Sequence, residues 1–478
     1  MAIFNLDTYT VNSDTTQGGT ILQHAPDLFV YVANNGYTVT LTGQGFRFDA
    51  KGLPTGGTIT GIGIVDPTAD ADIATASSLA FPLITFCTYN LDRTSATITT
   101  PPAYATVFDG NDTVFGHDGD NDLYGFGGSD VLNGAGGDDW MNGGSGTDRF
   151  FGGDGIDGVY FQTDTPTRGI VVDLSKTAGQ IVNDGFGNTE TVSSVEKIAG
   201  TAFADRITGN RTENGLFGDP GNDSLAGGGG QDFLAGENGN DILRGGAAGD
   251  QLNGGAGDDI LYGGAGFDVA LFWNVVAPGH GVKVNLALSQ NQVIDDGYGN
   301  AETLFSIEGV GGSEFADTLT GNATGNELGG NGGRDRIFGG DGDDDLYGVE
   351  DADKIFGGHG DDDLYGGLDA DTLTGGKGID SFLFQGSEAG FDTITDFNHG
   401  TDRIAYGAAL DGAPLIADQF LAAAGATRAL TAQQRVIYDT TTHSLYFDAD
   451  GLGGVASVKF AELINGATVT FGDVFLFD

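Results

Sequence analysis

The sequence has little positive charge, almost no cysteine and no long apolar run. It carries 19 Lys and Arg against 68 Asp and Glu, for a net charge of −49 over 478 residues. Nucleic acids and anionic membrane surfaces repel so acidic a chain, so neither is expected as a partner. The single cysteine, Cys87, excludes an internal disulfide framework. No apolar run approaches about 18 residues, so we expect no transmembrane helix and no membrane insertion.

The motifs of common hydrolases are also missing. The sequence contains no HExxH helix of a zinc protease and no GxSxG nucleophile elbow. Its six histidines are scattered, and the serine of GGSGT at 143–147 lies in a repeated glycine turn. Carboxylate pairs are abundant, but their regular spacing favours metal ligands over the acid–base pair of a glycosidase. The sequence therefore predicts a protein that is not an enzyme.

Glycine and aspartate are abundant, and they recur with a period of nine. Residues 218–271 read as GDPGNDSLA, GGGGQDFLA, GENGNDILR, GGAAGDQLN, GGAGDDILY and GGAGFDVAL. Asp takes the sixth place of every line, and an apolar residue follows two places later. This is the nonapeptide pattern G-G-x-G-x-D-x-U-x, in which U is a large apolar residue.

The nonapeptide pattern predicts one turn and one short strand per repeat. Glycine permits the positive φ of a tight turn, and x-U-x suits a brief strand with one side chain directed inward. Two repeats make a coil of 18 residues, and stacked coils form a right-handed parallel β-roll. We therefore predict an all-β protein, built on a parallel β-roll, which is a nonapeptide-repeat solenoid.

Stacking places the aspartates in two columns. One column holds Asp223, Asp241 and Asp259, and the other holds Asp232, Asp250 and Asp268. Neighbours in a column lie ~4.8 Å apart. At an effective dielectric of ~20 two carboxylates at that distance repel by roughly 3 kcal/mol, and too few cations are present to pair them. Turns rich in carboxylate oxygens favour a hard divalent cation, and Ca²⁺ fits best, bound at multiple sites.

The register divides the chain into three β-roll blocks with other segments around them. The predicted parts are an N-terminal β domain or cap (1–106), block 1 (107–161), a β linker segment (162–199), block 2 (200–271), a second linker that repeats the first (272–311), block 3 (312–383) and a β-rich C-terminal cap (384–478). The predicted metal ligands are the sixth-place residues Asp112, Asp130, Asp139, Asp148, Asp157, Asp223, Asp232, Asp241, Asp250, Asp259, Asp268, Asp335, Asp344, Asp353, Asp362, Asp371 and Asp380.

Some turns depart from the pattern. The sixth place holds Asn121 in one turn, which is expected to bind weakly or through a shifted ligand. Asp351 and Asp369 replace the fourth-place glycine, and Asp tolerates the left-handed region well enough for these turns to survive. The first repeats of blocks 2 and 3 carry an aromatic residue at the fourth place. We interpret them as apolar starters and do not count Asp205 and Asp317 among the calcium ligands.

The two linkers match each other at an offset of 112 residues. Residues 171–210 align with 283–322, which pairs Asp184 with Asp296, Glu190 with Glu302, and Glu196 with Glu308. Apolar runs followed by DG-x-G-N turns predict a β-hairpin or a two-strand extension in each linker. Because each linker leads into the next block, its expected role is to start that block's stack.

The terminal regions lie outside the register. Alternating apolar residues around 37–41 and 59–64 predict strands, and Pro101–Pro102 marks a plausible boundary. Beyond Leu383 we expect strands around 436–439, 444–454 and 469–478, and a helical patch near 417–434. Asp448 and Asp450 fit an extra calcium site and an ordinary Asp-rich turn about equally.

The repeats resemble the RTX (repeats-in-toxin) family of hemolysin-type calcium-binding proteins over about residues 107–478. The resemblance implies that Ca²⁺ lies between same-side turns, bound by sixth-place Asp side chains and turn carbonyls. It also implies export from a Gram-negative bacterium by a type I (ABC) exporter that reads an uncleaved C-terminal signal. Residues 473–477 are similar to that signal, acidic and then apolar, although Asp478 departs from it.

Calcium chemistry is consistent with that route. Cytosolic calcium is too scarce to fill weak sites, so repulsion keeps the blocks unfolded during export. Extracellular-type sites have dissociation constants of ~10⁻⁴–10⁻³ M, and there binding energy becomes folding energy. The N-terminal MAIFNLDTYTVNSD also lacks the basic and apolar segments of a conventional secretory signal.

The resulting hypothesis is a secreted, non-enzymatic calcium-binding protein, extracellular or on the cell surface, with a structural or adhesive role. A cell-surface or extracellular polysaccharide is a candidate partner beside the calcium ions and the exporter. Two alternatives place the function in residues 1–106. The region is then either an enzyme of unrecognised fold or a carbohydrate- or surface-binding module.

Overall fold

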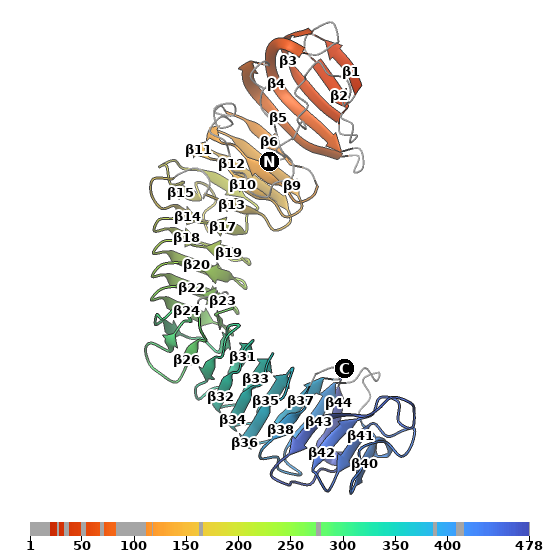
Figure 1. Ribbon diagram of the computed structural model, residues 1–478. Helices are drawn as coiled ribbons and strands as arrows, with labels where there is room; N and C mark the ends of the chain where they lie inside the picture. The colour runs from red at the N-terminus through yellow and green to blue at the C-terminus, as the bar shows by residue number, and fades with distance from the viewer. Residues whose placement is uncertain are drawn as a thin grey trace. The chain divides into compact units, whose positions relative to one another are not determined.

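The protein is built almost wholly of short β-strands (Figure 1). The computed structural model describes residues 20–25, 28–32, 38–48, 54–66, 71–82, 111–116, 118–161, 166–273, 279–385, 390–407 and 415–477. Within these ranges the only helices are two 3-10 turns, η1 (Ala417–Gln419) and η2 (Phe471–Asp473). The described residues contain no helix long and apolar enough to cross a membrane. The chain forms two compact units, Met1–Phe233 and Leu234–Asp478.

The first unit begins with an antiparallel meander. Its strands are β1 (Thr20–Ala25), β2 (Leu28–Val32), β3 (Thr38–Phe48), β4 (Pro54–Asp66) and β5 (Ala71–Pro82). The strands expected around 37–41 and 59–64 are confirmed as β3 and β4. Strand β5 pairs antiparallel with β6 (Thr113–Phe115), the first strand of the roll. Cys87 and the boundary at Pro101–Pro102 lie outside the described residues, and the limits of the N-terminal part stay a prediction.

Beyond β6 the first unit is a parallel β-roll with the expected period. Strand β9 pairs with β12 so that Val131 faces Arg149, 18 residues later. The other strands of this unit's roll are β7 (Asp122–Tyr124), β8 (Gly127–Gly128), β9 (Val131–Gly136), β10 (Trp140–Asn142), β11 (Ser145–Gly146), β12 (Arg149–Asp154), β13 (Gly158–Tyr160), β14 (Val171–Asp173), β15 (Ile181–Asn183), β16 (Thr191–Ser193), β17 (Lys197–Ala199), β18 (Arg206–Thr208), β19 (Gly215–Phe217) and β20 (Ser224–Gly229). The predicted fold class, an all-β parallel roll, is confirmed.

The second unit repeats the same construction. Its β32 pairs parallel with β34, and Ile337 faces Ile355 across the pair. After β21 (Phe233–Ala235), the strands up to the end of the repeats are β22 (Ile242–Ala247), β23 (Gln251–Asn253), β24 (Ile260–Ala265), β25 (Val269–Leu271), β26 (Lys283–Asn285), β27 (Val293–Asp295), β28 (Thr303–Phe305), β29 (Gly309–Gly311), β30 (Thr318–Thr320), β31 (Glu327–Asn331), β32 (Arg336–Asp341), β33 (Asp345–Val349), β34 (Lys354–His359), β35 (Asp363–Gly367), β36 (Thr372–Lys377) and β37 (Ser381–Gln385).

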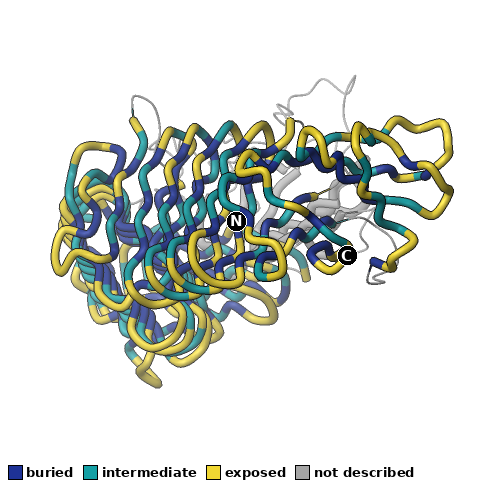
Figure 2. Tube along the Cα trace, turned by 90° about the horizontal axis from the view of Figure 1, so that it is seen from below, coloured by how far each residue is buried: buried dark blue, intermediate teal, exposed yellow. Residues whose placement is uncertain are grey.

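The apolar residue of each repeat forms the core of the roll. Leu319, Ile337, Ile355 and Leu373 follow one another at 18-residue intervals and are fully buried. Figure 2 shows buried residues recurring along each coil, with exposed turns between them. Burial of one such side chain stabilises the fold by about 1.5–3 kcal/mol. The core is therefore a line of aliphatic contacts, one residue deep per strand, and it leaves the turns at the surface.

Each linker forms a hairpin and continues the roll. Strands β14 and β15 pair antiparallel in the first linker, as β26 and β27 do in the second, which confirms the expected hairpins. Strands β14 and β26 also pair parallel with β18 and β30, the first strands of the next block. The linkers thus start the following stack, as predicted, and β16 and β28 close the preceding one.

The roll extends beyond its last nonapeptide into the C-terminal region. Strands β38 (Asp392–Ile394) and β39 (Arg403–Gly407) add parallel to β36 and β37. The remaining strands are β40 (Phe420–Ala423), β41 (Val436–Asp439), β42 (Ser444–Phe447), β43 (Val458–Leu463) and β44 (Val474–Phe477). The helical patch expected near 417–434 is wrong. Residues 420–423 pair with β41 as a strand, and Gly425 follows at a φ of 72°, which ends any helix.

Candidate calcium sites

In most of the described repeat turns the sixth-place Asp folds back over the first glycine of its own repeat. A Cβ on Gly125 would collide with Oδ2 of Asp130 and lie 2.6 Å from the carbonyl oxygen of Gly143 in the next coil. The same holds for Gly339, whose Cβ would meet Oδ2 of Asp344 and the carbonyl of Gly357. The missing Cβ therefore leaves a space edged by one carboxylate oxygen and one carbonyl oxygen.

The turn itself depends on left-handed residues at its second and fourth places. In the turn of Asp130 these are Phe126 at a φ of 73° and Gly128 at 125°. Asp351 and Asp369, which replace the fourth-place glycine, adopt φ of 69° and 73°. Those two turns survive as predicted, because Asp enters the left-handed region at modest cost.

One oxygen of each Asp carboxylate is used to stack the coils. The backbone N–H of Asp130 donates to Oδ1 of Asp148 at 2.7 Å, one coil later. The N–H of Asp335 donates likewise to Oδ1 of Asp353 at 2.8 Å. Because the bond recurs at 18-residue spacing, the two predicted columns exist within each unit. In the folded roll these backbone hydrogen bonds hold the carboxylates in line.

The second oxygen of the carboxylate is buried and accepts no hydrogen bond. This is true of Oδ2 in Asp130, Asp139, Asp157, Asp259, Asp268, Asp335, Asp344, Asp353, Asp362 and Asp380. A buried charged oxygen without a partner costs several kcal/mol, so each of these atoms requires a cation or a proton. Within the described residues, no group of three or more His, Cys, Asp and Glu side chains is placed to hold a metal. Carboxylate and carbonyl oxygens are thus the available ligands, a donor set that suits Ca²⁺ and does not suit zinc.

The remaining predicted ligands occupy the same place in their turns. Asp112, the first in its column, is buried and donates its N–H to Oδ1 of Asp130 at 2.7 Å. The others are buried and make further contacts: Asp148, Asp223, Asp232, Asp241, Asp250 and Asp371. Asn121 places its amide oxygen over Gly116 as an Asp would. Equivalent positions are therefore shown for all of them, and their binding of Ca²⁺ stays a prediction.

Burial shifts the carboxylates strongly towards the protonated form in the absence of a cation. It raises the pKa of Asp353 to about 8, an effect to which the negative charges of Asp335 and Asp371 add. The pKa of Asp130 is raised to about 8 and that of Asp335 to about 7, also mainly by burial. At neutral pH many of the aspartates in a metal-free column would therefore be protonated.

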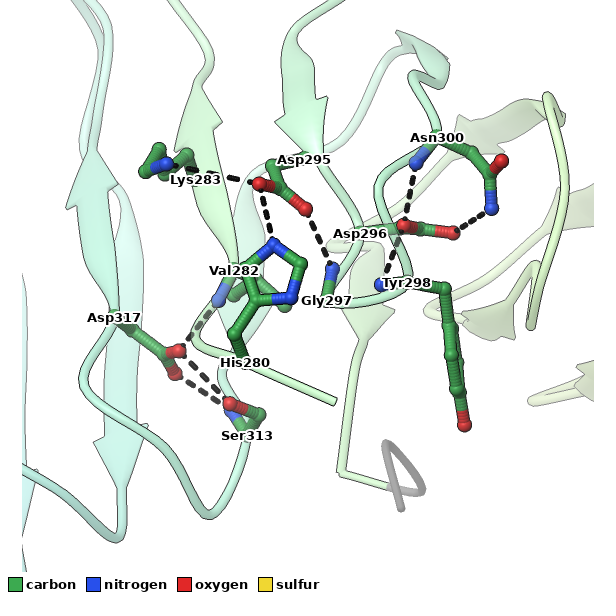
Figure 3. A network of polar contacts seen from close by, with 10 residues as sticks. All are labelled: His280, Val282, Lys283, Asp295, Asp296, Gly297, Tyr298, Asn300, Ser313 and Asp317. Atoms are coloured by element: carbon green, nitrogen blue, oxygen red, sulfur yellow. Dashed lines mark hydrogen bonds and ion pairs between the residues drawn. The ribbon is translucent and has the colours of Figure 1, made fainter. Parts of the chain in front are cut away.

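In the starter repeats, the first repeats of blocks 2 and 3, both oxygens of the sixth-place carboxylate accept hydrogen bonds. Oδ1 of Asp317 accepts the N–H of Val282 at 2.7 Å and the hydroxyl of Ser313, and Oδ2 accepts the N–H of Ser313 at 2.6 Å (Figure 3). Asp205 is bonded equivalently by Ile170 and Thr201. Both oxygens of each carboxylate accept hydrogen bonds, which supports leaving Asp205 and Asp317 out of the calcium ligands.

Sequence reasoning missed several acidic residues that the fold inserts into the columns. Oε2 of Glu196 accepts the N–H of Asp157 at 3.0 Å, as an Asp in the next repeat would. Glu308 does the same for Asp268 at 3.0 Å. Glu190 and Glu302 precede β16 and β28, which continue the other column. All four share a signal that a search could use, an acidic residue two places before a buried aliphatic one.

The columns also continue into the C-terminal region. Asp371 donates its N–H to Oδ1 of Asp392 at 3.0 Å, and Asp380 donates to Oδ1 of Asp402 at 3.4 Å. The sequences DTI and DRI carry the same acid-to-aliphatic spacing, although 21 and 22 residues separate them from their partners. Asp448 is buried, its Oδ1 is unpaired and its Oδ2 accepts the N–H of Ala429. This arrangement fits both an extra calcium site and an ordinary Asp-rich turn.

The DG-x-G-N loops of the linkers are held by hydrogen bonds. Oδ1 of Asp296 accepts the N–H groups of Tyr298 and Asn300 at 2.8 and 2.9 Å, and Oδ2 accepts Nδ2 of Asn300 (Figure 3). Asp184 makes the equivalent bonds in the first linker. These aspartates therefore shape a loop, and their oxygens are already used.

Comparison with known proteins agrees with this geometry. A family model described as the RTX calcium-binding nonapeptide repeat (4 copies) matches residues 109–125, 124–159, 199–234, 214–243, 235–270, 311–346, 320–354 and 347–382. No curated protein matches the sequence significantly. A crystal structure of the extracellular lipase LipA from Serratia marcescens aligns at 13% identity over 94% of this chain and 82% of that one. Its TM-score is 0.19, which carries no argument. By its matched repeats, the chain belongs to the family of RTX calcium-binding nonapeptide-repeat proteins.

Proposed function

We propose that the sixth-place aspartates bind Ca²⁺ between stacked turns and that the chain folds when they do so, outside the cell. The buried, unpaired Oδ2 atoms carry this proposal. Each needs a positive partner, and in turns such as those of Asp130 and Asp344 a carbonyl oxygen of the next coil lies nearby. Calcium supplies the charge and accepts both oxygen types at once. Binding energy at these turns is then folding energy for the roll.

The same chemistry supports a secreted protein. RTX repeat proteins are generally extracellular. Where calcium is scarce, rows of aligned carboxylates oppose folding, which suits a chain threaded through a type I exporter of a Gram-negative bacterium. Asp473 of the proposed export segment is buried in the folded protein, with Nδ1 of His399 at 2.7 Å from its Oδ2 and Thr470 also bonded to it. The exporter would therefore read this segment before the C-terminal region folds.

The proposed role is structural or adhesive, at the cell surface or in the extracellular matrix. A long roll that presents regular turns is a scaffold for a surface layer or a polysaccharide matrix. We assign no enzymatic activity to the chain, because its acidic residues serve the turns and the stacking of coils.

A calcium titration of the purified full-length chain tests the proposal. Far-UV circular dichroism and small-angle X-ray scattering would follow secondary structure and compactness, with Mg²⁺ as the control ion. We expect a cooperative collapse to a compact β-rich particle at about millimolar Ca²⁺ and none with Mg²⁺. A chain that is equally compact in chelator would show that the columns do not depend on calcium, and the proposed ligands would be abandoned.

A further inference from the structure

Each linker contributes one buried glutamate that ends an aspartate column. Glu302 is fully buried, and both of its carboxylate oxygens lack a hydrogen-bond partner. Glu190, its counterpart in the first linker, is also buried; its Oε2 is unpaired, and its side chain is hydrogen-bonded to that of Asp148. A buried ionised glutamate in this state costs several kcal/mol unless a cation lies against it.

The register places Glu302 directly after Asp259 in the column. Strand β28 pairs with β24 so that Thr303 faces Ile260, and the N–H of Thr303 donates to the carbonyl of Asp259 at 3.0 Å. Glu302 and Asp259 are therefore neighbours on adjacent parallel strands, with backbones ~4.8 Å apart. Oδ2 of Asp259 is buried and unpaired as well. Three unpaired carboxylate oxygens thus belong to two neighbouring residues of the column.

The charges that act most strongly on Glu302 are negative. Within the described part of the chain, the strongest charge effects on this side chain come from aspartates, namely Asp259, Asp296, Asp241 and Asp258. The backbone of Glu302 is held by a two-way pairing with Val293 of the hairpin. The side chain is consequently fixed in an acidic, water-poor position by the fold itself.

The neighbouring glutamate of the same linker shows what an ordinary column member looks like. Oε2 of Glu308 accepts the N–H of Asp268 at 3.0 Å, the bond made by Asp side chains throughout the roll. Glu302 makes no such bond to the backbone of Asp259. The longer side chain therefore replaces Asp in the column without taking over its stacking role, and its oxygens are left for another ligand.

We propose that Glu302 and Asp259 together bind a Ca²⁺ ion that closes the column in the second unit, and that Glu190 and Asp148 bind its counterpart in the first. Two carboxylates with turn carbonyls supply hard oxygen ligands of the kind that Ca²⁺ takes. The glutamates lie outside the nonapeptide repeats, so each linker carries a metal ligand of its own. The inference rests on the proposal that the repeats bind Ca²⁺, and it adds the linkers to the binding machinery.

A protonated glutamate is the competing explanation, and the geometry disfavours it. A neutral carboxyl at Glu302 would still place a donor and an acceptor among buried groups without bonding either. The repetition of the arrangement at a 112-residue offset indicates a feature of the linker rather than an accident of one site.

Counting bound ions tests the proposal. Full-length protein saturated with Ca²⁺ would be measured by equilibrium dialysis and atomic emission, as wild type, E302Q and E190Q/E302Q. Gln keeps the size of the side chain and removes its charge. We expect one ion fewer per chain in E302Q and two fewer in the double variant. Glu314→Gln, an exposed carboxylate of the starter turn that follows the second linker, is the control and should bind the wild-type number. Folded variants that retain the wild-type count would overturn the proposal.

A second measurement covers the case in which the variants fail to fold. Crystals of the wild-type chain grown with Tb³⁺ as a calcium substitute would give an anomalous map of the bound ions. A peak within about 2.6 Å of a carboxylate oxygen of Glu302 is expected. Peaks at repeat positions such as Asp353 with none at Glu302 would reject this proposal alone, and a map without peaks at the repeats would reject the calcium function as well.

Discussion

Two turns of the third block lie one coil apart, and their equivalent sixth-place carboxylates have different hydrogen-bond partners. Asp317 and Asp335 are both buried, and Oδ1 of each accepts a backbone N–H from the preceding coil, at 2.7 Å in both cases. They differ at Oδ2. In the starter turn it accepts the N–H of Ser313 at 2.6 Å, whereas in the repeat turn Oδ2 of Asp335 has no partner.

The difference follows from the backbone at the second place of the turn. That place is Asn331 in the turn of Asp335, and it has a φ of 71°. The same place is left-handed in the turns of Asp344 and Asp353, where it is Gly340 and Val349. Ser313 keeps an ordinary negative φ and points its N–H at the carboxylate. A left-handed second residue thus removes a hydrogen-bond donor from the carboxylate, and a left-handed residue at that place marks the turns that are proposed to bind calcium.

The largest effect expected from this comparison comes from Asp→Asn substitution in the two turns. Asp335→Asn removes the charge beside the orphaned position, so the variant should lose about 3 kcal/mol of stability when calcium is 100-fold above its dissociation constant. In chelator the same substitution should be neutral or stabilising, because it relieves repulsion in the column. Urea unfolding with and without calcium measures both values.

Asp317→Asn is the matched substitution and should behave differently. The new amide group would face the N–H of Ser313 or Val282, which already donate to the carboxylate. We expect a loss of about 1–3 kcal/mol that is the same with and without calcium. Equal calcium dependence of the two variants would remove the distinction between starter and repeat turns.

The next effect concerns the glycine beneath the carboxylate. Gly330→Ala places a Cβ against Oδ2 of Asp335 and 3.0 Å from the carbonyl oxygen of Gly348. Displacing these oxygens should cost about 2 kcal/mol and raise the calcium midpoint of folding. Gly329→Ala, one residue earlier, puts its Cβ in open space and serves as the control. The proposed cradle would be rejected if the two variants titrated alike.

Much of this comparison could be read from the sequence, because the repeat carries its geometry locally. A glycine at a fixed place, an Asp five residues later and an aliphatic residue two further on specify turn, ligand and core within one nonapeptide. The tolerance of Asp351 and Asp369 for the left-handed region, and the separate status of Asp205 and Asp317, followed from the same local rules.

What the sequence did not reveal depends on contacts across long intervals. Glu196 and Glu308 join the column 39 and 40 residues after their partners, because a hairpin leaves the coil and returns to it. Asp392 and Asp402 follow intervals of 21 and 22 residues, which breaks a nine-residue count but not the stacking of strands. The false helix near 417–434 has a related cause, since pairing with β41 overrides local preference.

The effect of pH on stability should also differ between repeat turns and starter turns, by a smaller amount. Burial raises the pKa of Asp353 to about 8, whereas the pKa of Asp317 rises only to about 6 because hydrogen bonds from Ser313 oppose the effect of burial. A carboxylate with a raised pKa in the folded state stabilises that state fully below its unfolded pKa of about 4, and the contribution is lost as pH rises to about 8.

Two results follow from that sign. In chelator the chain should be more β-rich at pH 5 than at pH 8, by circular dichroism. With calcium present, protons compete for the repeat carboxylates, so the calcium midpoint should rise on the order of tenfold between pH 7.5 and pH 5.5. A midpoint that does not move over this range would show that the repeat carboxylates are ionised before calcium arrives.

The smallest expected effect comes from a repeat turn in which a β-branched residue occupies the left-handed second place. Val349 has a φ of 90°, a conformation that a β-branched side chain adopts only under strain. Val349→Gly should therefore stabilise the calcium-loaded protein by about 1 kcal/mol, since relief of strain exceeds the added freedom of the unfolded chain. Val349→Ala keeps a Cβ and should gain less. Both would be measured by urea unfolding at saturating calcium. A loss of stability in the glycine variant would mean that contacts of the half-exposed valine outweigh the conformation, and that the left-handed second place is not what strains this turn.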